Sequence, residues 1–308
     1  MNDALKQILK KQGYGIIGEN SGVKLCHWLK ESLVGGRSCY KQSFYGIQSH
    51  RCIQMSPAMD QCTQNCLFCW RFQGFSDIDI KDADEPKFVV EESIKAQRRL
   101  ISGFKGNPET NKDKWKEANN PKHVAISLTG EPTLYPYLGD LIKEYHSKGI
   151  TTFLVTNGTM PNVLENLNPL PTQLYITVAA PNDKIYERLL APMIKDGWNR
   201  LNRTLELLPS LDTRKVIRHT LVDGWNLNYL DEYAKLDLKA DPDFIEPKAY
   251  VYVGYSRERL NMSNMPSFQK IKDFSEQLSL KTGFEIKDQR EDSRVVLLSK
   301  HKNNYKLF

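Results

Sequence analysis

Three cysteines lie close together in the spacing C-x3-C-x2-C, at Cys62, Cys66 and Cys69. With that spacing, one loop can bring three thiolates to a single inorganic centre. A structural zinc ion takes four protein ligands, whereas a site with three keeps one position open for chemistry. An iron–sulfur cubane held by three thiolates also leaves one iron open. The triplet therefore predicts a reactive inorganic centre with one open coordination position.

Three more cysteines precede this loop, each separated from the next by twelve residues: Cys26, Cys39 and Cys52. In a chain without a secretory signal, six cysteines are not expected to form a disulfide framework. Three interpretations stay open for the second trio. It can form another three-thiolate centre, its members can be buried apolar residues, or Cys52 can complete a closed zinc site with the triplet.

The composition is that of an ordinary soluble globular protein, with 308 residues, 40% of them hydrophobic and 26% charged. No apolar run reaches about 18 residues, the length that predicts a membrane-spanning helix. The N-terminus also lacks the apolar core of a signal peptide. We therefore expect a cytoplasmic monomer that is not attached to a membrane.

Positive charge is concentrated in two segments. Residues 95–122 carry eight Lys/Arg against three Asp/Glu, and residues 294–308 carry four against none. Basic segments with interleaved aromatic residues suit a phosphate backbone and unstacked bases, although an ordinary solvated surface explains the charge equally well. The candidate contacts are Arg98, Arg99, Trp115, Tyr305 and Phe308.

Short apolar runs alternate with amphipathic stretches from residue 45 onward, which is typical of βα units around a parallel sheet. Strands are expected at 45–56, 124–128, 151–155, 174–178, 216–221 and 249–253. Helices are expected at 4–11, around Cys26, and at 88–102, 138–149, 198–208 and 266–281, with a hairpin at 284–299. Six units are too few for a closed eight-fold barrel, so we predict an α/β fold, a partial (β/α)6 barrel of the TIM type. We expect an N-terminal extension (1–44), the barrel (45–260) and a C-terminal extension (261–308).

Polar motifs follow the first three predicted strands. The cysteine loop follows the first, Gly130 and Glu131 follow the second, and Thr156 and Asn157 follow the third. The carboxyl ends of parallel strands meet at one edge of a sheet, so we expect these motifs to converge on one ligand. Gly130 would let the ligand approach the backbone, Glu131 or nearby carbonyls would hold a cationic amine, and Thr156 and Asn157 would bind a ribose or carboxylate.

The cysteine triplet, with Phe68 just before its third member, resembles the signature of the radical S-adenosylmethionine (SAM) superfamily. The string Gly130-Glu131-Pro132 resembles the second motif of that superfamily. The resemblance implies a [4Fe–4S] cluster whose open iron is chelated by the amino and carboxylate groups of SAM, with Phe68 near the adenine. An external one-electron reductant would then drive cleavage of SAM to methionine and a 5′-deoxyadenosyl radical.

The N-terminal cysteine trio, together with the string 127–133 (SLTGEPT), resembles the archaeal type of tRNA 4-demethylwyosine synthase. That resemblance implies a carbon–carbon lyase that condenses N1-methylguanosine at position 37 of tRNA-Phe with pyruvate. The radical would abstract hydrogen from the N1-methyl group, and the methylene radical would attack the pyruvate carbonyl. Loss of the carboxyl carbon and closure onto the guanine amine would complete the base. Cys26, Cys39 and Cys52 would then hold a second [4Fe–4S] cluster that binds pyruvate.

Lys41, two residues beyond Cys39, is the candidate catalytic lysine under this resemblance. It would activate pyruvate as a Schiff base or act as an acid–base group, which requires a pKa lowered by burial or by nearby positive charge. The competing interpretation is an ordinary surface lysine.

Several cationic side chains are candidates for substrate binding. Arg218 and His219 are expected to face the same region and to bind SAM or the pyruvate carboxylate, unless they have structural partners. The same alternatives apply to His50 and Arg51. The basic segments, including Arg98 and Arg99, would hold the anticodon stem-loop of the tRNA, whose bases are accessible by unstacking.

Two other functions fit the same residues. One is a radical SAM enzyme with an auxiliary cluster that modifies a peptide or a small molecule and binds no tRNA. The other is a non-catalytic zinc protein that binds RNA, with Cys52 and the triplet around about one zinc ion per chain.

Overall fold

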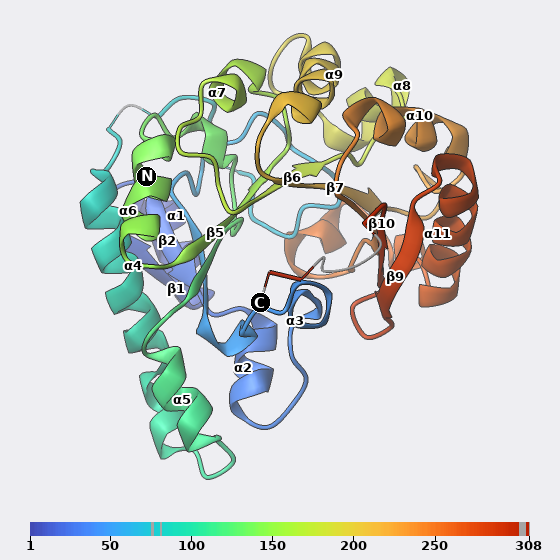
Figure 1. Ribbon diagram of the computed structural model, residues 1–308. Helices are drawn as coiled ribbons and strands as arrows, with labels where there is room; N and C mark the ends of the chain where they lie inside the picture. Colours follow the sequence, from blue (N-terminus) through green and yellow to red (C-terminus); the bar gives the residue numbers. More distant parts are fainter. Residues whose placement is uncertain (75–76, 81, 302–305, 308) are drawn as a thin grey trace.

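Ten strands form one sheet in the computed structural model, which describes residues 1–74, 77–80, 82–301 and 306–307. The six central strands, β3 to β8, are parallel to one another and lie side by side in chain order. They are Cys52–Ser56 (β3), His123–Ile126 (β4), Thr151–Thr156 (β5), Gln173–Thr177 (β6), Arg214–Leu221 (β7) and Phe244–Ala249 (β8). The sheet curves, as Figure 1 shows, and the predicted partial (β/α)6 barrel is confirmed.

Helices cover the convex side of this sheet (Figure 1). They are α4 (Pro86–Ile101), α6 (Leu138–Ser147), α7 (Pro161–Glu165), α9 (Gly197–Leu207), α10 (Leu230–Ala240) and α11 (Phe268–Thr282). Leu201 and Leu205, one turn apart on α9, are fully buried against strand residues such as Leu174. Alternate strand residues point to this layer, which leaves the others for the interior of the barrel.

One short helix, α3 (Tyr40–Tyr45), lies on the concave side of the sheet. Its aromatic residues pack against the inward-facing Phe153, Tyr175 and Phe244. The predicted strand at 45–56 is therefore wrong in its first half. Packing of Tyr45 into the barrel overrides its strand propensity, and Gly46, with φ of 78°, ends the helix in the left-handed region.

Both terminal segments add strands to the same sheet. The hairpin β1 (Tyr14–Ile17) and β2 (Ser21–Lys24) pairs with β3, and the predicted C-terminal hairpin, β9 (Glu285–Arg290) and β10 (Val295–Ser299), pairs with β8. Strands from all three predicted segments, on both sides of the boundaries at residues 44/45 and 260/261, therefore belong to one sheet. The division into three segments remains a prediction.

The last parallel strand lies five residues before the predicted one at 249–253. Proline argues against a strand interior because it cannot donate to the ladder, yet Pro247 lies within β8. The strand accepts it because the pairing with β10 is interrupted there, between Ile245 and Lys248. Residues 250–253 instead run along the edge of the barrel, where Val251 and Val253 are exposed.

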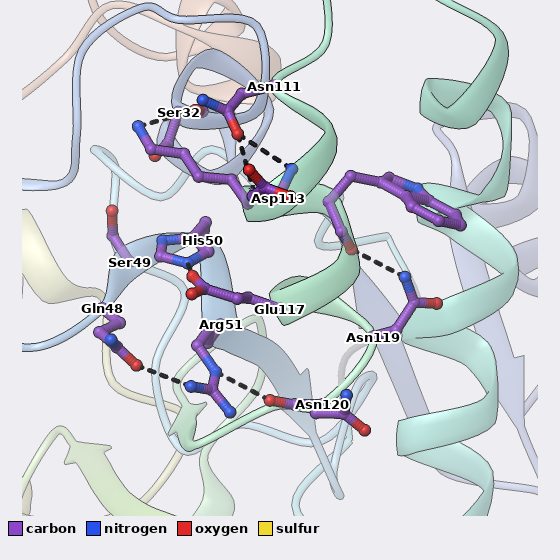
Figure 2. Close-up of polar contacts among 12 residues, drawn as sticks. Ser32, Gln48, Ser49, His50, Arg51, Asn111, Asp113, Glu117, Asn119 and Asn120 are labelled. Atoms are coloured by element: carbon purple, nitrogen blue, oxygen red, sulfur yellow. Dashed lines mark hydrogen bonds and ion pairs between the residues drawn. The ribbon is translucent and has the colours of Figure 1, made fainter.

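The basic segment 95–122 contains α5 (Lys112–Ala118), which packs against a 3-10 turn, η1 (Ser49–Arg51). His50 Nε2 lies 2.5 Å from Glu117 Oε2, and Arg51 Nε donates to the carbonyl of Asn120 at 3.0 Å (Figure 2). His50 and Arg51 thus have structural partners, as the alternative interpretation proposed. Among the described helices, which also include α1 (Asp3–Lys11), α2 (His27–Leu33) and α8 (Asp183–Ile185), none is long and apolar enough to cross a membrane.

His123, at the start of β4, should make the fold sensitive to acid. The Gln48 N–H donates to His123 Nε2 at 3.2 Å, and burial, with Arg51 nearby, lowers the pKa of His123 to about 4. The unfolded chain binds this proton near pH 6.5, so stability falls as the pH drops from about 6.5 to about 4. Between about pH 7 and pH 5 the loss is about 2 kcal/mol.

This prediction is checked with His123→Gln, whose amide oxygen can accept the same hydrogen bond without titrating. Denaturant unfolding at the two pH values should show that the variant loses about 2 kcal/mol less than the parent protein. The control is His27→Gln, at an exposed position. If acid lowers the free energy of unfolding equally in the parent and in His123→Gln, His123 is not the source of the acid sensitivity.

Candidate active site

A cavity of about 350 Å³ lies at the carboxyl ends of the parallel strands. All three predicted motifs contribute to it, so the convergence expected from the strand order is present in the structure. The lining residues predicted from sequence are Cys62, Cys66, Phe68, Cys69, Gly130, Glu131, Thr156, Asn157 and Arg218.

The thiols of the triplet are free. Burial, with smaller contributions from Glu131 and Cys69, raises the pKa of Cys62 to about 11. Burial, with Cys69 and Cys62, holds the pKa of Cys66 well above its usual range. Buried thiols of this kind lose their protons to a metal centre, which supplies the missing positive charge. Three thiols around one cavity fit the donor set of a three-thiolate cubane.

The geometry argues against the closed zinc site. Cys52 begins β3 and is not among the residues that line the cavity with the triplet. Burial, with Cys39 and Cys26 nearby, raises its pKa to about 12. Among the described residues, no group of three or more His, Cys, Asp or Glu side chains is set to hold a single metal ion. In a cubane each thiolate binds a different iron, so its sulfur atoms lie further apart than they do around one ion. The cysteines therefore form two separate trios.

Gly130 allows two backbone segments to pack closely, and its expected contact with a ligand remains a prediction. Its φ of +70° lies in the left-handed region, and a Cβ atom would collide with the carbonyl oxygen of Ala58 and lie 2.6 Å from that of Gln61. Glu131 N also donates to the Gln61 carbonyl at 2.7 Å. Glycine is therefore required because the backbone leading into the cysteine loop packs against it.

The Glu131 carboxylate is already bound by protein donors. Its Oε1 accepts from the Thr133 and Thr156 hydroxyls at 2.6 Å, and its Oε2 accepts from Asn157 N at 2.8 Å. Burial raises the pKa of Glu131, and these hydrogen bonds oppose the increase. The carboxylate therefore joins two loops, and its expected contact with a ligand amine remains a prediction. Thr156 is likewise engaged, and Asn157 Nδ2 donates to Thr63 Oγ1 at 2.8 Å.

The second trio lies where α2, α3 and β3 begin. Cys26 and Cys39 immediately precede α2 and α3, and Cys52 begins β3. Burial raises the pKa of Cys39 to about 11, with a further contribution from Cys26. Lys41 lowers the pKa of all three thiols, so it lies among them. The half-buried Lys41 Nζ is 4.2 Å from the ring centre of Tyr175.

Two charged residues of the interior were missed by the sequence reasoning. Glu246 and Lys248 alternate along β8, and both point into the barrel. The buried Glu246 accepts from Arg218 Nε at 3.1 Å and from the Tyr40 and Tyr45 hydroxyls at 3.0 and 2.5 Å. Burial, with Arg218 nearby, lowers the pKa of Lys248 to about 8. The sequence did contain a signal: two charged residues stand two positions apart in an otherwise apolar strand. Such residues point to the same face of the sheet.

Arg218 and His219 do not face the same region. Arg218 lines the cavity, whereas His219 is fully buried on the opposite face of β7. His219 Nε2 lies 3.0 Å from both carboxylate oxygens of Asp237, on α10, and its Nδ1 is 2.8 Å from the Val178 carbonyl. The expectation that His219 binds substrate is corrected because consecutive residues of a strand point to opposite faces.

The basic residues of the 95–122 segment lie outside the cavity lining. Arg98 Nε donates to the Asn119 carbonyl at 2.8 Å, and Arg99 lies 3.9 Å from Glu92. Trp115 Nε1 donates to the Ile101 carbonyl at 2.9 Å, which anchors its indole. The candidate contacts Tyr305 and Phe308 lie outside the described residues.

Residues 56–236 match the family model described as the radical SAM superfamily, and residues 239–300 match the model described as wyosine base formation. With the partial barrel and its thiol loop, the first match defines a radical SAM enzyme, a class that implies SAM and a [4Fe–4S] cluster. More particularly, the chain belongs to the family of the SAM-dependent tRNA 4-demethylwyosine synthases. It is 54% identical to that synthase from Pyrococcus abyssi over 97% of this chain and 89% of the relative.

Other comparisons agree with this assignment. The synthase from Methanocaldococcus jannaschii is 41% identical over 96% of each chain. The structure of TYW1 with a lysine–pyruvate adduct bound has a TM-score of 0.91 and 40% identity, covering 100% of this chain and 99% of that one. The crystal structure of archaeal TYW1 has a TM-score of 0.82 and 37% identity, covering 100% of both.

Replacement of Glu131 by Gln should disturb the whole carboxyl edge. An amide NH2 would oppose either the Asn157 N–H or the Thr156 and Thr133 hydroxyls, leaving a buried donor unpaired. We expect the free energy of unfolding to fall by about 2 kcal/mol and SAM binding to weaken about tenfold or more. Denaturant unfolding and SAM titration of the reconstituted enzyme measure the two effects. Glu165→Gln, at an exposed position of α7, is the control, and unchanged stability of Glu131→Gln would refute the loop-joining role.

Proposed function

We propose that this enzyme condenses N1-methylguanosine at position 37 of tRNA-Phe with pyruvate to form 4-demethylwyosine. The observation that carries the proposal is a cationic wall of the barrel interior that reaches the cavity of the cysteine triplet. Arg218 and Lys248 line the same cavity as Cys62 and Cys66. A small anion bound at this wall would lie beside the site where SAM is cleaved.

The charges of the interior favour an anionic substrate. Lys41, Arg218 and Lys248 face one carboxylate, that of Glu246, so protonation of both lysines would leave a net positive interior. The Arg218 guanidinium is held by Glu246 and stacks 4.5 Å from the ring centre of Tyr175. An arginine held in this way presents its remaining N–H groups to a carboxylate in a fixed direction. Arg218 would therefore bind the pyruvate carboxylate.

The two cysteine trios would hold two [4Fe–4S] clusters, one at Cys62, Cys66 and Cys69 and the other at Cys26, Cys39 and Cys52. When bound, the first supplies the electron that cleaves SAM, and the second supplies an open iron for the pyruvate carboxylate and carbonyl. The chain itself excludes water, because α3 and its aromatic neighbours fill the amino-terminal end of the barrel.

Lys41 is our candidate for bonding to pyruvate. Burial, with the charge of Arg218, lowers the pKa of Lys41 and increases the share of its neutral, nucleophilic amine. The amine would attack the pyruvate carbonyl carbon, and water would leave as the Schiff base forms. The lysine–pyruvate adduct in the TYW1 structure supports a lysine in this role. Lys248 is the alternative, although its Nζ already donates to the Ser293 carbonyl at 2.6 Å.

The tRNA would contact the exposed basic surface of α4 and α5, which includes Arg98 and Arg99. A cytoplasmic location would keep the six thiols reduced before cluster assembly. An external one-electron reductant and a monomeric state complete the proposal.

The assignment of Lys41 is tested in the anaerobically reconstituted enzyme. With SAM, pyruvate, a reductant and N1-methylguanosine-containing tRNA-Phe, the parent should hold about eight irons per chain and make the tricyclic base only when pyruvate is present. Lys41→Met should cleave SAM but make at least about a hundredfold less product. Borohydride should trap labelled pyruvate on the parent and on Lys248→Met. Trapping that survives in Lys41→Met and disappears in Lys248→Met would reassign the lysine, and SAM cleavage indifferent to pyruvate and tRNA would refute the proposed reaction.

The tRNA surface is tested by reversing charge at Arg98 and Arg99 together. Each arginine that neutralises a phosphate releases counterions, so its loss should weaken binding and reduce the slope of log K against log salt by about one. The double variant should therefore reduce the slope by about two. Filter binding or anisotropy across a salt series measures both effects. A matched control is the double reversal of Arg200 and Arg203 on α9, which makes the same change in net charge. Equal slopes for parent and Arg98→Glu/Arg99→Glu would exclude this surface.

A further inference from the structure

The cysteine loop is held by Arg71, a residue that the motif does not include. The side chain of Arg71 is only 5% exposed and lines the same cavity as the three thiols. Its Nη2 donates to the backbone carbonyl of Gln64, between the first and second cysteines, at 3.2 Å. The Arg71 guanidinium therefore lies at the wall of the cavity that Cys62, Cys66 and Cys69 also line.

The loop is also held by Arg259, just beyond the 3-10 turn η6 (Gly254–Glu258). Arg259 Nε donates to the Leu67 carbonyl at 3.2 Å, and its Nη2 donates to the Cys69 carbonyl. Tyr255 N donates to the Trp70 carbonyl at 3.0 Å. Gly254, with φ of +60°, permits this approach because a Cβ atom there would collide with the Trp70 carbonyl oxygen.

These contacts meet two different needs of a buried cluster. A cubane held by three thiolates carries net negative charge, and reduction adds more. In a site of low dielectric constant such charge is stable only beside a compensating cation, and a nearby positive charge favours the reduced state. The sulfur atoms must also keep their spacing, which depends on the loop backbone. Arg71 lies where it can compensate charge, and Arg259 where it can fix the backbone.

We propose that Arg71 and Arg259 are positioning residues for the cluster, with Arg71 compensating its charge from the cavity and Arg259 fixing the backbone carbonyls of Leu67 and Cys69. The inference rests on the proposed cluster at Cys62, Cys66 and Cys69. Arg71 lies in the segment that matches the radical SAM model, and Arg259 in the segment that matches wyosine base formation. The second segment therefore helps to hold the cofactor of the first.

The test uses the full chain with Cys26, Cys39 and Cys52 replaced by Ala, so that only the triplet can hold a cluster. Reconstituted protein should contain about four irons per chain. Its reduction is followed by EPR in a redox titration. Arg71→Met should shift the reduction equilibrium against the reduced cluster by about tenfold, which is 59 mV for a one-electron couple. Arg71→Lys, which keeps the charge, should recover more than half of the shift.

Arg259→Met should leave the reduction potential close to that of the parent but release iron to a chelator at least about threefold faster. Its matched control is Arg257→Met, two residues away, whose exposed guanidinium stacks on Tyr252 instead of binding the loop. Arg257→Met should release iron at the parent rate. If Arg71→Met does not retain iron, Arg71→Gln replaces it, and the same shift in potential is expected.

The outcomes separate this inference from the proposed function. A parent that takes up no iron would overturn the cluster assignment and the inference with it. A parent with about four irons and an Arg71→Met variant of unchanged potential would overturn charge compensation alone. Charge compensation would also be overturned if the reduction potential of Arg71→Lys is as low as that of Arg71→Met. Iron release from Arg259→Met at the rate of Arg257→Met would overturn the backbone role.

Discussion

The buried carboxylate of Glu131 lies where three loops of the barrel meet, and the geometry of the cavity depends on it. It accepts hydrogen bonds from Thr133 in its own loop and from Thr156 and Asn157 in the next. Its backbone N–H reaches the Gln61 carbonyl at the start of the cysteine loop. An ionised acceptor without water around it is stable only when protein donors surround it. The three loops are therefore held in one arrangement, which is the arrangement that brings their functional groups together.

In the interior of the barrel, a second buried carboxylate, that of Glu246, is also surrounded by protein donors. Glu246 binds Arg218 and the hydroxyls of Tyr40 and Tyr45, so that α3 is attached to the far edge of the parallel sheet. This attachment also gives the Arg218 guanidinium a fixed direction. The interior of this radical SAM barrel thus combines an aromatic plug with a cationic wall.

Local patterns predicted much of the fold. Strands and helices alternate as expected, and the polar residues after the first three strands meet at one edge, because each βα unit carries its own periodicity. The errors occurred where a distant contact decided the outcome. Tyr45 entered a helix because the barrel interior accepts its ring, and the last strand shifted to include Pro247 because its neighbour is interrupted there. His219 was assigned to the wrong face because a strand boundary alone does not show which residues point inward.

By itself, the sequence determined the donor chemistry and the order in which it appears. The spacing of Cys62, Cys66 and Cys69 lies within one loop, and residues so close in the chain cannot separate far whatever the fold. Only the tertiary structure decided which partners these groups have: that Cys52 belongs with the other trio, that Glu131 joins loops, and that Glu246 orients the interior. The physical reason is distance along the chain. Contacts such as that of Tyr40 with Glu246 join residues 206 positions apart, and they arise from strand register and sheet curvature, which no local pattern specifies.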